Sequence, residues 1–294
     1  MTRLSLKQIE YFRAVMEAGT VSGAAALLHV SQPNVSRMLK YTESRLGMNL
    51  FERRSGRLLA TPQAQALFRE VQSLHQHLES LQEAVDRIAS GQAGRLSVGA
   101  SPSLGRFVLP SVISQLRRTF PSLPVKLDIL SVSQVIDYLI YGQGECACTI
   151  FPINDPRIES EPFAPGALVC AVPKEHRLNG SKAITAQDIA GEPLIGFDAY
   201  TPHGQVVTQF FAASGLTPAM AYTVRFAESA CALVEQGDGV ALVDEFTVSG
   251  NAFPNLVCVQ TRFRRPFRIY FHRSRERPLS TAGLKFRDLL SEWR

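Results

Sequence analysis

A short segment near the start of the chain is rich in side chains that could contact nucleic acid. Its candidate residues are Ser31, Gln32, Pro33, Asn34, Ser36, Arg37 and Lys40. The amides of Gln and Asn can bond two edge atoms of adenine, an Arg guanidinium can do the same with guanine, and Ser or Lys suits phosphate oxygens. These residue types favour DNA binding, although a solvated helix in a small helical bundle has a similar composition.

This segment is predicted to be the third helix of a helix-turn-helix. Apolar residues at helical spacing indicate a first helix from Leu6 to the break at Gly19. A short Ala-rich helix follows over residues 21–28. Ser31 is placed to cap the third helix, with Pro33 in its first turn, where a missing N–H is harmless. The core side of the third helix is predicted from three apolar residues, Val35, Leu39 and Leu46.

A basic segment after the third helix is predicted to be the wing of a winged helix-turn-helix domain over residues 1–60. Leu50 and Phe51 form an apolar anchor, and Ser55-Gly56 is typical of a hairpin turn. The wing carries Arg53, Arg54 and Arg57. Such arginines contact the phosphate backbone and position a domain without reading sequence.

Basic charge is concentrated at the two ends of the sequence, although the whole chain has a net charge of only +5. Residues 1–60 hold nine Lys or Arg against four Asp or Glu, residues 61–260 hold twelve against nineteen, and residues 261–294 hold ten against three. A basic N-terminal segment suits a polyanion such as DNA. There is no signal-peptide pattern or membrane-length apolar segment, and five cysteines are scattered. We therefore expect a cytoplasmic protein without membrane contact or a disulfide framework.

Residues 61–90 are predicted to form one long helix that pairs with the same helix of a second chain. Thr61 can cap this helix and Pro62 can begin it. Its apolar residues recur at alternating steps of three and four and form a heptad seam: Ala64, Leu67, Val71, Leu74, Leu78, Leu81, Val85 and Ile88. The seam could also pack on its own domain, but its regularity favours a homodimer, which presents two recognition helices to two half-sites.

Residues 91–294 alternate between strand and helix patterns, which predicts an α/β fold with largely parallel sheets. The elements fall into two groups, so we expect a hinged domain of two lobes. Lobe I is predicted to comprise residues 95–163 and 268–294, and lobe II residues 167–266. In such sheets a ligand binds beyond the carboxyl ends of the strands, at the switch point.

Polar and aromatic residues follow the predicted strands at this edge and are the candidate ligand-binding residues. They are Ser101, Pro102, Ser103, Ser131, Val132, Ser133, Phe151, Phe197, Thr201, His203, Phe226, Glu228 and Asp244. Hydroxyls and N–H groups at helix starts favour an anion, although each residue taken singly could serve only as a cap or in a hydrated loop. We predict a small carboxylate or an amino acid, with its anion at Ser101–Ser103 and its cation near Glu228 or Asp244.

Two cysteines that share a strand face with Ile150, Cys146 and Cys148, raise the alternative of a thiol- or oxidant-sensing protein. A buried apolar face is favoured, because no further Cys or His lies nearby to complete a metal site. The chain has no nucleophile elbow, phosphate loop, dinucleotide fingerprint or zinc spacing, so we expect neither an enzyme nor a cofactor or metal. The N-terminal domain disfavours a simple ligand carrier.

The N-terminal sixty residues closely resemble the LysR-type transcriptional regulators. The match lies in Val30-Ser31-Gln32-Pro33-Asn34-Val35-Ser36-Arg37, followed by Leu39-Lys40, Glu43, Leu46-Gly47, Leu50-Phe51, Arg53, Arg57 and Thr61. Thr42 departs from the family pattern, which usually has Leu there, and Ala60 stands where Leu usually precedes the Thr. Two short segments, Phe12-Arg13-Ala14-Val15-Met16 and Thr61-Pro62-Gln63-Ala64, resemble regulators of lysine and opine metabolism.

This resemblance extends in length and landmarks over nearly the whole chain. It implies a winged helix-turn-helix, a linker helix, and a two-lobed effector domain like the periplasmic binding proteins. It also implies double-stranded DNA, a small-molecule inducer, a homodimer or homotetramer, and, for an activator, RNA polymerase as partners. The function expected is therefore transcription regulation controlled by an inducer.

Overall fold

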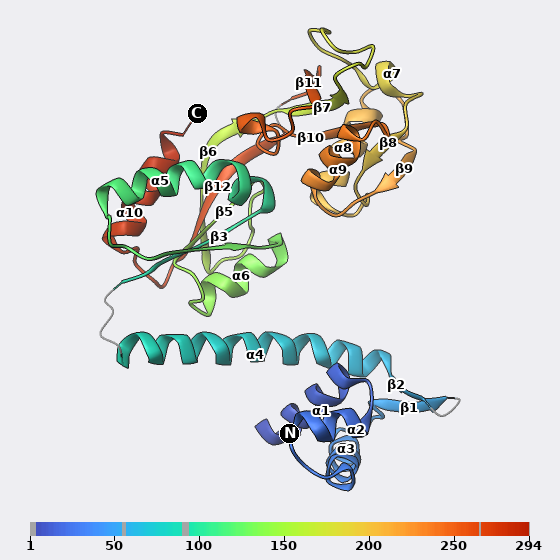
Figure 1. Ribbon diagram of the computed structural model, residues 1–294, viewed down its shortest axis with the longest axis vertical. Coiled ribbons are helices and arrows are strands. Elements are labelled where there is room, and N and C mark those ends of the chain that lie inside the picture. The colour runs from blue at the N-terminus through green and yellow to red at the C-terminus, as the bar shows by residue number, and fades with distance from the viewer. Residues whose placement is uncertain (1–3, 55–56, 90–93, 265, 294) are drawn as a thin grey trace. The chain divides into compact units, whose positions relative to one another are not determined.

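The computed structural model describes residues 4–54, 57–89, 94–264 and 266–293 (Figure 1). The chain divides into two compact units, Met1–Gly91 and Gln92–Arg294. None of the described helices is long and apolar enough to cross a membrane.

The first unit contains three short helices, a hairpin and one long helix. Their bounds are α1 (Leu6–Ala18), α2 (Val21–Leu27), α3 (Gln32–Leu46), β1 (Phe51–Arg54), β2 (Arg57–Ala60) and α4 (Pro62–Ala89). Ser5 and Gln8 form a capping box at the start of α1, and Thr20 caps α2. Gly19 and Gly47 follow α1 and α3 with φ of 67°, a left-handed conformation that ends a helix at little strain.

The core of this unit holds the inner face of α3. Val35 and Leu39 are buried with Val15 and Ala24, whereas Leu46, predicted on the same face, is half-buried against a second cluster. Thr42 is also buried, and its hydroxyl lies 3.3 Å from the Gln8 amide nitrogen, which donates to it. The polar residue at the family's usual Leu position is thus satisfied by a buried hydrogen bond.

The heptad seam of α4 changes its environment along the helix. Ala64 and Val71 are buried against Phe12 and Leu50. Farther along, the exposed fractions rise to 45% for Leu78, 61% for Leu81 and 48% for Val85. Ile88 lies outside the residues whose side chains are described. The first half of the seam therefore packs on its own unit, and the second half leaves apolar side chains in contact with solvent.

The second unit is built on two five-stranded sheets, and we call the part around each sheet a lobe. Lobe I has the strand order β4-β3-β5-β12-β6, and lobe II has β11-β7-β10-β8-β9. The lobe I strands are β3 (Leu96–Ala100), β4 (Val125–Ile129), β5 (Cys146–Thr149), β6 (Ile158–Gly166) and β12 (Phe267–Ser274). The lobe II strands are β7 (Leu168–Pro173), β8 (Leu194–Gly196), β9 (Met220–Thr223), β10 (Val240–Asp244) and β11 (Leu256–Gln260). The chain crosses between the lobes after β6 and again after β11.

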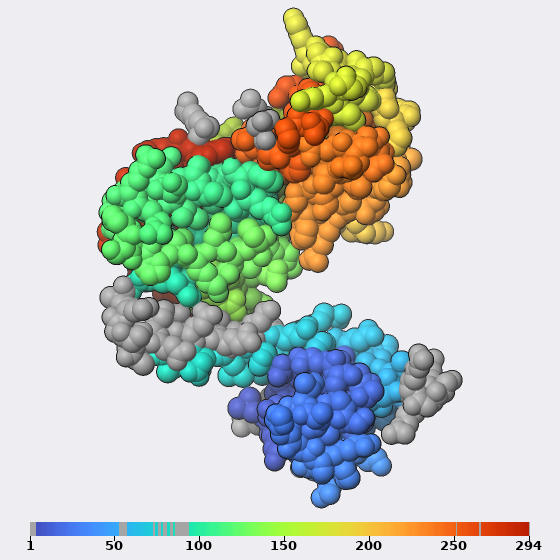
Figure 2. Space-filling view, in the orientation of Figure 1, coloured from blue at the N-terminus to red at the C-terminus, as the bar shows by residue number. Residues whose placement is uncertain are grey.

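Helices cover both lobes. Those of lobe I are η1 (Leu104–Val108), α5 (Leu109–Thr119), α6 (Val132–Ile140) and α10 (Thr281–Ser291), and those of lobe II are α7 (Ala186–Ile189), α8 (Pro202–Ala212), α9 (Ala227–Glu235) and η2 (Ser249–Asn251). In lobe I, α5 and α10 lie together on one face of the sheet and α6 lies on the other (Figure 1). Figure 2 shows the two lobes in contact, lobe I mainly in green and lobe II in yellow and orange.

The sheets are more mixed than the predicted, largely parallel arrangement. β12 pairs antiparallel with β5 and β6, and β7 pairs antiparallel with β10 and β11. β6 was not predicted, because Pro162 and Pro165 argue against a strand. In the lobe I order β6 is an edge strand, where a missing N–H is tolerated.

Two predicted boundaries are also wrong. The sequence pattern predicts a helix over residues 106–120, but the helix begins near Pro102 and passes through the π-helical turn η1 before α5. The same pattern predicts a strand over residues 147–151, whereas β5 covers Cys146–Thr149. Hydrophobic periodicity places the centre of an element better than its ends, which depend on local hydrogen bonds.

Candidate functional site

The outer face of α3 is a polar, accessible surface. Gln32, Pro33, Arg37 and Lys40 are exposed. Asn34 and Ser36 are half-buried, and the Asn34 side-chain amide donates to the Tyr11 hydroxyl at 3.3 Å. Because Val35 and Leu39 hold the opposite face in the core, this surface points away from the domain. It offers amide, hydroxyl, guanidinium and ammonium groups on one rigid helix.

Ser31 stands at the N-cap position of α3, but its hydroxyl makes no capping hydrogen bond. The expected side-chain cap is therefore wrong. The Ser31 carbonyl accepts instead from the backbone N–H groups of Asn34 and Val35, at 3.0 and 3.3 Å. Pro33 fits the first turn because it has no N–H to satisfy. The exposed Ser31 hydroxyl remains available to a phosphate oxygen.

The hairpin beside α3 has the register of a two-stranded wing. Phe51 pairs with Ala60 and Arg54 pairs with Arg57. The side chains of Arg53, Arg54 and Arg57, and the predicted turn at Ser55-Gly56, lie outside the described residues. Their phosphate contacts remain a prediction.

One carboxylate of α3 fixes the start of this hairpin. Glu43 Oε1 accepts from the backbone N–H of Leu50 at 2.8 Å and of Phe51 at 3.1 Å. The hydroxyl of Thr61 donates to the Asn49 carbonyl at 3.0 Å and accepts from the Ala64 N–H. These bonds tie the hairpin and the start of α4 to α3, a positioning role that the residue types alone did not reveal.

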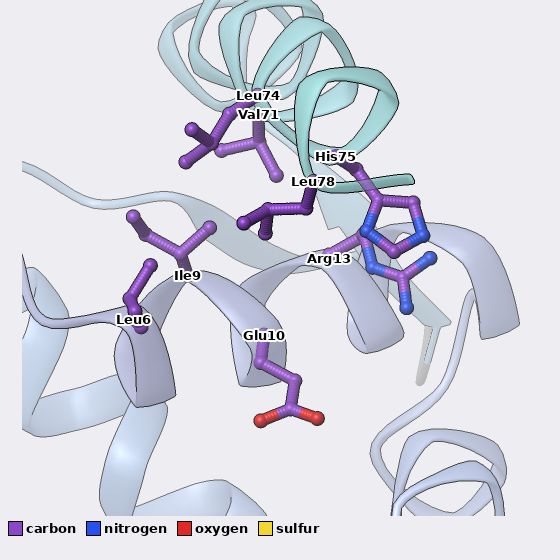
Figure 3. Close-up of a pocket in the computed structure, with 8 residues that line it drawn as sticks. All are labelled: Leu6, Ile9, Glu10, Arg13, Val71, Leu74, His75 and Leu78. Atoms are coloured by element: carbon purple, nitrogen blue, oxygen red, sulfur yellow. The ribbon is translucent and has the colours of Figure 1, made fainter. Parts of the chain in front are cut away.

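A groove of about 200 Å³ runs between α1 and α4 (Figure 3). It is lined by Leu6, Ile9, Glu10, Arg13, Val71, Leu74, His75 and Leu78. Its apolar floor is continuous with the exposed second half of the α4 seam, because Leu78 belongs to both.

A cavity of about 520 Å³ lies between the two lobes of the second unit. It is lined by Ser101, Pro102, Ser103, Leu130, Ser131, Val132, Ser133, Ile150, Phe151, Tyr200, Thr201, Pro202, His203, Arg225, Phe226, Ala227, Glu228 and Asp244. Of the candidate ligand-binding residues, the structure brings all but Phe197 to this wall. Phe197 is buried behind it, with its ring 4.9 Å from the His203 ring.

Lobe I contributes hydroxyls at two helix starts. Ser101 and Ser103 are buried after β3, where the chain turns into η1. Ser131 precedes α6, and its hydroxyl donates to the Gln134 side-chain oxygen at 2.8 Å and lies 3.1 Å from the Ser133 hydroxyl. The first N–H groups of a helix have no acceptor within the helix, so both starts suit an anionic group.

Lobe II contributes an imidazole–carboxylate pair. His203 Nε2 lies 3.1 Å from Asp244 Oδ2, and the Asp244 side chain is fully buried. The His203 ring lies 5.3 Å from the rings of both Phe151 and Phe267, which belong to lobe I. These ring contacts join the two lobes at the cavity wall.

Some lining residues were absent from the sequence-based set. They are Leu130, Ile150, Tyr200, Pro202, Arg225 and Ala227. Arg225 stands between β9 and α9, so the strand-end rule could have found it. Its guanidinium lies 5.2 Å from the Phe226 ring centre, at the exposed rim. Tyr200, which is 92% exposed, carries no such signal.

The cysteine pair lies in the core. Cys146 and Cys148 are fully buried in the same apolar cluster as Ile150. Burial raises the pKa of both thiols, so the reactive thiolate is disfavoured. The thiol-sensing alternative gains no support. Within the described part of the chain, no three His, Cys, Asp or Glu side chains gather as metal ligands.

Two family models together match nearly the whole chain. The model described as "Bacterial regulatory helix-turn-helix protein, lysR family" matches residues 6–65, and "LysR substrate binding domain" matches residues 89–294. The chain is 30% identical to the transcriptional activator protein LysR of Escherichia coli K12 over 287 residues, which cover 97% of this chain and 92% of that protein.

A further relative and a solved structure agree with this match. The chain is 31% identical to the octopine catabolism/uptake operon regulatory protein OccR of Rhizobium meliloti, over 82% of this chain and 80% of that protein. Its fold resembles full-length CbnR crystallised with its target DNA, with a TM-score of 0.71 and 22% identity, covering 98% of this chain and 99% of that chain.

Proposed function

We propose that this chain, which belongs to the LysR family of DNA-binding transcriptional regulators, binds DNA as a homodimer through α3 and responds to an effector in the cavity between its lobes. We propose the cytoplasm as its compartment. Homotetramers and RNA polymerase, for an activator, are further proposed partners.

The outer face of α3 carries this proposal. Its groups match the edges of bases and the oxygens of phosphates, and its inner face is locked in the core. We assign Gln32, Asn34 and Arg37 to base edges, and Ser31, Ser36 and Lys40 to phosphates. The arginines of the hairpin are assigned to the flanking backbone, in keeping with the basic first sixty residues. CbnR, whose fold this chain shares, was crystallised with its target DNA.

The exposed part of the α4 seam supports the homodimer. Isolated apolar side chains are common on surfaces, but Leu78, Leu81 and Val85 continue a regular heptad seam. A second α4 packed on this seam would cover them. Its apolar side chains could also fill the groove between α1 and α4 (Figure 3). A dimer of this kind pairs two α3 helices for half-sites about 34 Å apart, or a multiple of that.

The effector is proposed to be a small carboxylate or an amino acid. The cavity is of metabolite size, and the hydroxyls at the starts of η1 and α6 suit its anionic end. The relative OccR is named as the regulatory protein of an octopine catabolism and uptake operon. Octopine is an amino-acid derivative, so this likeness favours an amino acid or a related acid as the effector of this chain.

The salt dependence of DNA affinity tests the DNA-binding part. We expect the full-length chain to lose about 10³–10⁵ in affinity for a labelled duplex between ~50 and ~200 mM salt, because bound cationic side chains release counterions. Lys40→Ala should reduce the slope of log affinity against log salt concentration by about one per chain. Lys182→Ala, which removes an exposed charge from the second unit, is the matched control. Equal affinity at both salt concentrations would contradict the proposal.

A further inference from the structure

The two carboxylates of the cavity wall differ in how their oxygens are satisfied. Asp244 Oδ1 accepts from the Thr247 N–H at 3.0 Å. Asp244 Oδ2 accepts from the Thr247 hydroxyl at 2.8 Å and lies 3.1 Å from His203 Nε2. Both oxygens of Asp244 are therefore occupied by the protein, and this residue serves to hold the wall together.

Glu228 has one oxygen that the protein does not satisfy. Its Oε1 lies 3.4 Å from Arg106 Nε, a long contact, while its Oε2 is buried without a hydrogen-bond partner among the described residues. Among the described residues, the Ser101 hydroxyl is the other buried side-chain oxygen without a hydrogen-bond partner. A buried, unsatisfied polar atom costs free energy, and the cost is larger for a charged group. Both residues line the same cavity, and both atoms are covered in this structure, so a ligand that displaces the groups covering them can satisfy both.

The two residues belong to different lobes. Ser101 follows β3 in lobe I, and Glu228 lies in the first turn of α9 in lobe II. The ion pair of Glu228 with Arg106 of η1 also joins the lobes. The next residue of η1, Phe107, has its ring 5.9 Å from the Phe253 ring of lobe II. One π-helical turn thus carries both of these contacts between the lobes, and such turns are frequent at functional sites.

We propose that the effector carries a cationic nitrogen that donates to Oε2 of Glu228 and an anionic group that accepts from the Ser101 hydroxyl. Glu228, rather than Asp244, is then the residue that distinguishes a zwitterion from a plain carboxylate. The bound molecule ties lobe I to lobe II beside the Arg106–Glu228 ion pair, so recognition of its charge and closure of the lobes are one event. This inference rests on the proposed effector site.

Matched pairs of compounds test this assignment. The probes are L- and D-amino acids and, for each, the carboxylic acid that lacks only the amino group. Thermal unfolding of the full-length chain detects a ligand, because a compound that binds only the folded state raises its melting temperature. Calorimetric titration then gives the Kd of each stabilising pair for the wild type, Glu228→Gln and Glu175→Gln. Glu175 is exposed on lobe II outside the cavity wall, so it is the charge-matched control.

We expect at least one amino compound to bind the wild type more tightly than its deaminated partner, by about 10- to 100-fold. Glu228→Gln should remove this preference, and Glu175→Gln should retain it. The unfolding transition of the second unit, which contains Glu228, checks that the Glu228→Gln chain is folded. The preference of the wild type needs no variant at all. If deaminated acids bind as well as the amino compounds, or if Glu228→Gln keeps the preference, the inference is wrong while the carboxylate effector stands. If neither the amino compounds nor the deaminated acids bind the wild type, both this inference and the proposed carboxylate effector are wrong.

Discussion

The outer face of α3 and the cavity between the lobes are built in opposite ways. The α3 face is carried by one helix, and its exposed side chains require little from the rest of the domain. The cavity is assembled from strand ends and helix starts of two lobes, and two of its oxygens are buried without partners among the described residues. The exposed polar side chains of α3 therefore cost the folded protein little stability. The unsatisfied oxygens of the cavity, in contrast, lower the stability of the effector-free chain.

The largest effect should come from breaking the pairing of the helices that present the α3 face. Replacing Leu81 and Val85 by Asp puts charges on the exposed part of the α4 seam, where a second helix would have to bury them. We expect monomers in sedimentation and a loss of specific DNA affinity on the order of 10³-fold, since one half-site then binds alone. Gln72→Asp, on the same helix but off the seam, is the control. Intact dimers in the double variant would contradict the role given to α4.

In the interior of lobe I, His272 of β12 is fully buried. Its Nε2 and Nδ1 lie 2.7 and 2.8 Å from the hydroxyls of Thr149 and Ser160, and burial lowers its pKa to about 4. Since an unfolded His titrates near 6.5, the unfolded chain binds a proton between these pH values and the folded chain does not. The contribution of His272 to the free energy of unfolding of the second unit should not change with pH above about 6.5, and below that pH it should lower this free energy by up to about 1.4 kcal/mol per pH unit.

Urea unfolding of the wild type and His272→Gln between pH 7.5 and 5 measures this difference. The variant should lose the part of the acid sensitivity that His272 supplies, roughly 2 kcal/mol at pH 5. The transition of the first unit is the internal control, because His272 lies outside it. Parallel pH profiles for the two proteins would refute the assignment.

Arg37→Ala tests the α3 face itself. We expect specific DNA affinity to fall by about 1–3 kcal/mol, because a guanidinium bonded to a guanine edge is lost. The free energy of unfolding should change by less than about 0.5 kcal/mol, since Arg37 is exposed and its removal leaves no buried gap. Arg117→Ala, at an exposed position of α5, is the control for DNA affinity. An unchanged affinity in the Arg37 variant would remove this residue from the interface.

The smallest effect is expected for Ser101→Ala, which should raise the stability of the effector-free chain. Ser101→Ala removes a buried hydroxyl that has no partner among the described residues, so the effector-free chain should become more stable by about 1 kcal/mol. Binding of the effector should weaken at the same time. Chemical unfolding without ligand checks the first effect. A clear loss of stability would show that the hydroxyl is satisfied in the protein and would weaken the case for a ligand contact there.

The first unit could be predicted from sequence because its determinants are local. Capping residues, helix-ending glycines and apolar spacing of 3.6 all act within a few residues, and together they locate α1 to α4. Glu43 could not be given a role in this way. Its bonds to the N–H groups of Leu50 and Phe51 depend on where the chain returns after α3.

The residues that line the cavity could largely be predicted from the sequence, but the hydrogen bonds of its carboxylates could not. The rule that ligands bind at the carboxyl ends of strands selected Ser101, His203 and Glu228, which line one cavity although they are far apart in sequence. This rule could not reveal that both carboxylate oxygens of Asp244 have hydrogen-bond partners in the protein, whereas Oε2 of Glu228 has none among the described residues. That difference depends on Thr247 and on a π-helical turn, which have no periodic signature.

The measurement closest to the central claim, that the outer face of α3 reads base edges, is selection of binding sites from random DNA by the full-length chain and by Arg37→Ala. The wild type should enrich two symmetry-related half-sites separated by one helical turn or a multiple of it. The variant should lose its preference at one base pair in each half-site and keep the others. If both proteins enrich the same sequences with the same strength at every position, α3 does not read DNA through Arg37 and the account is contradicted.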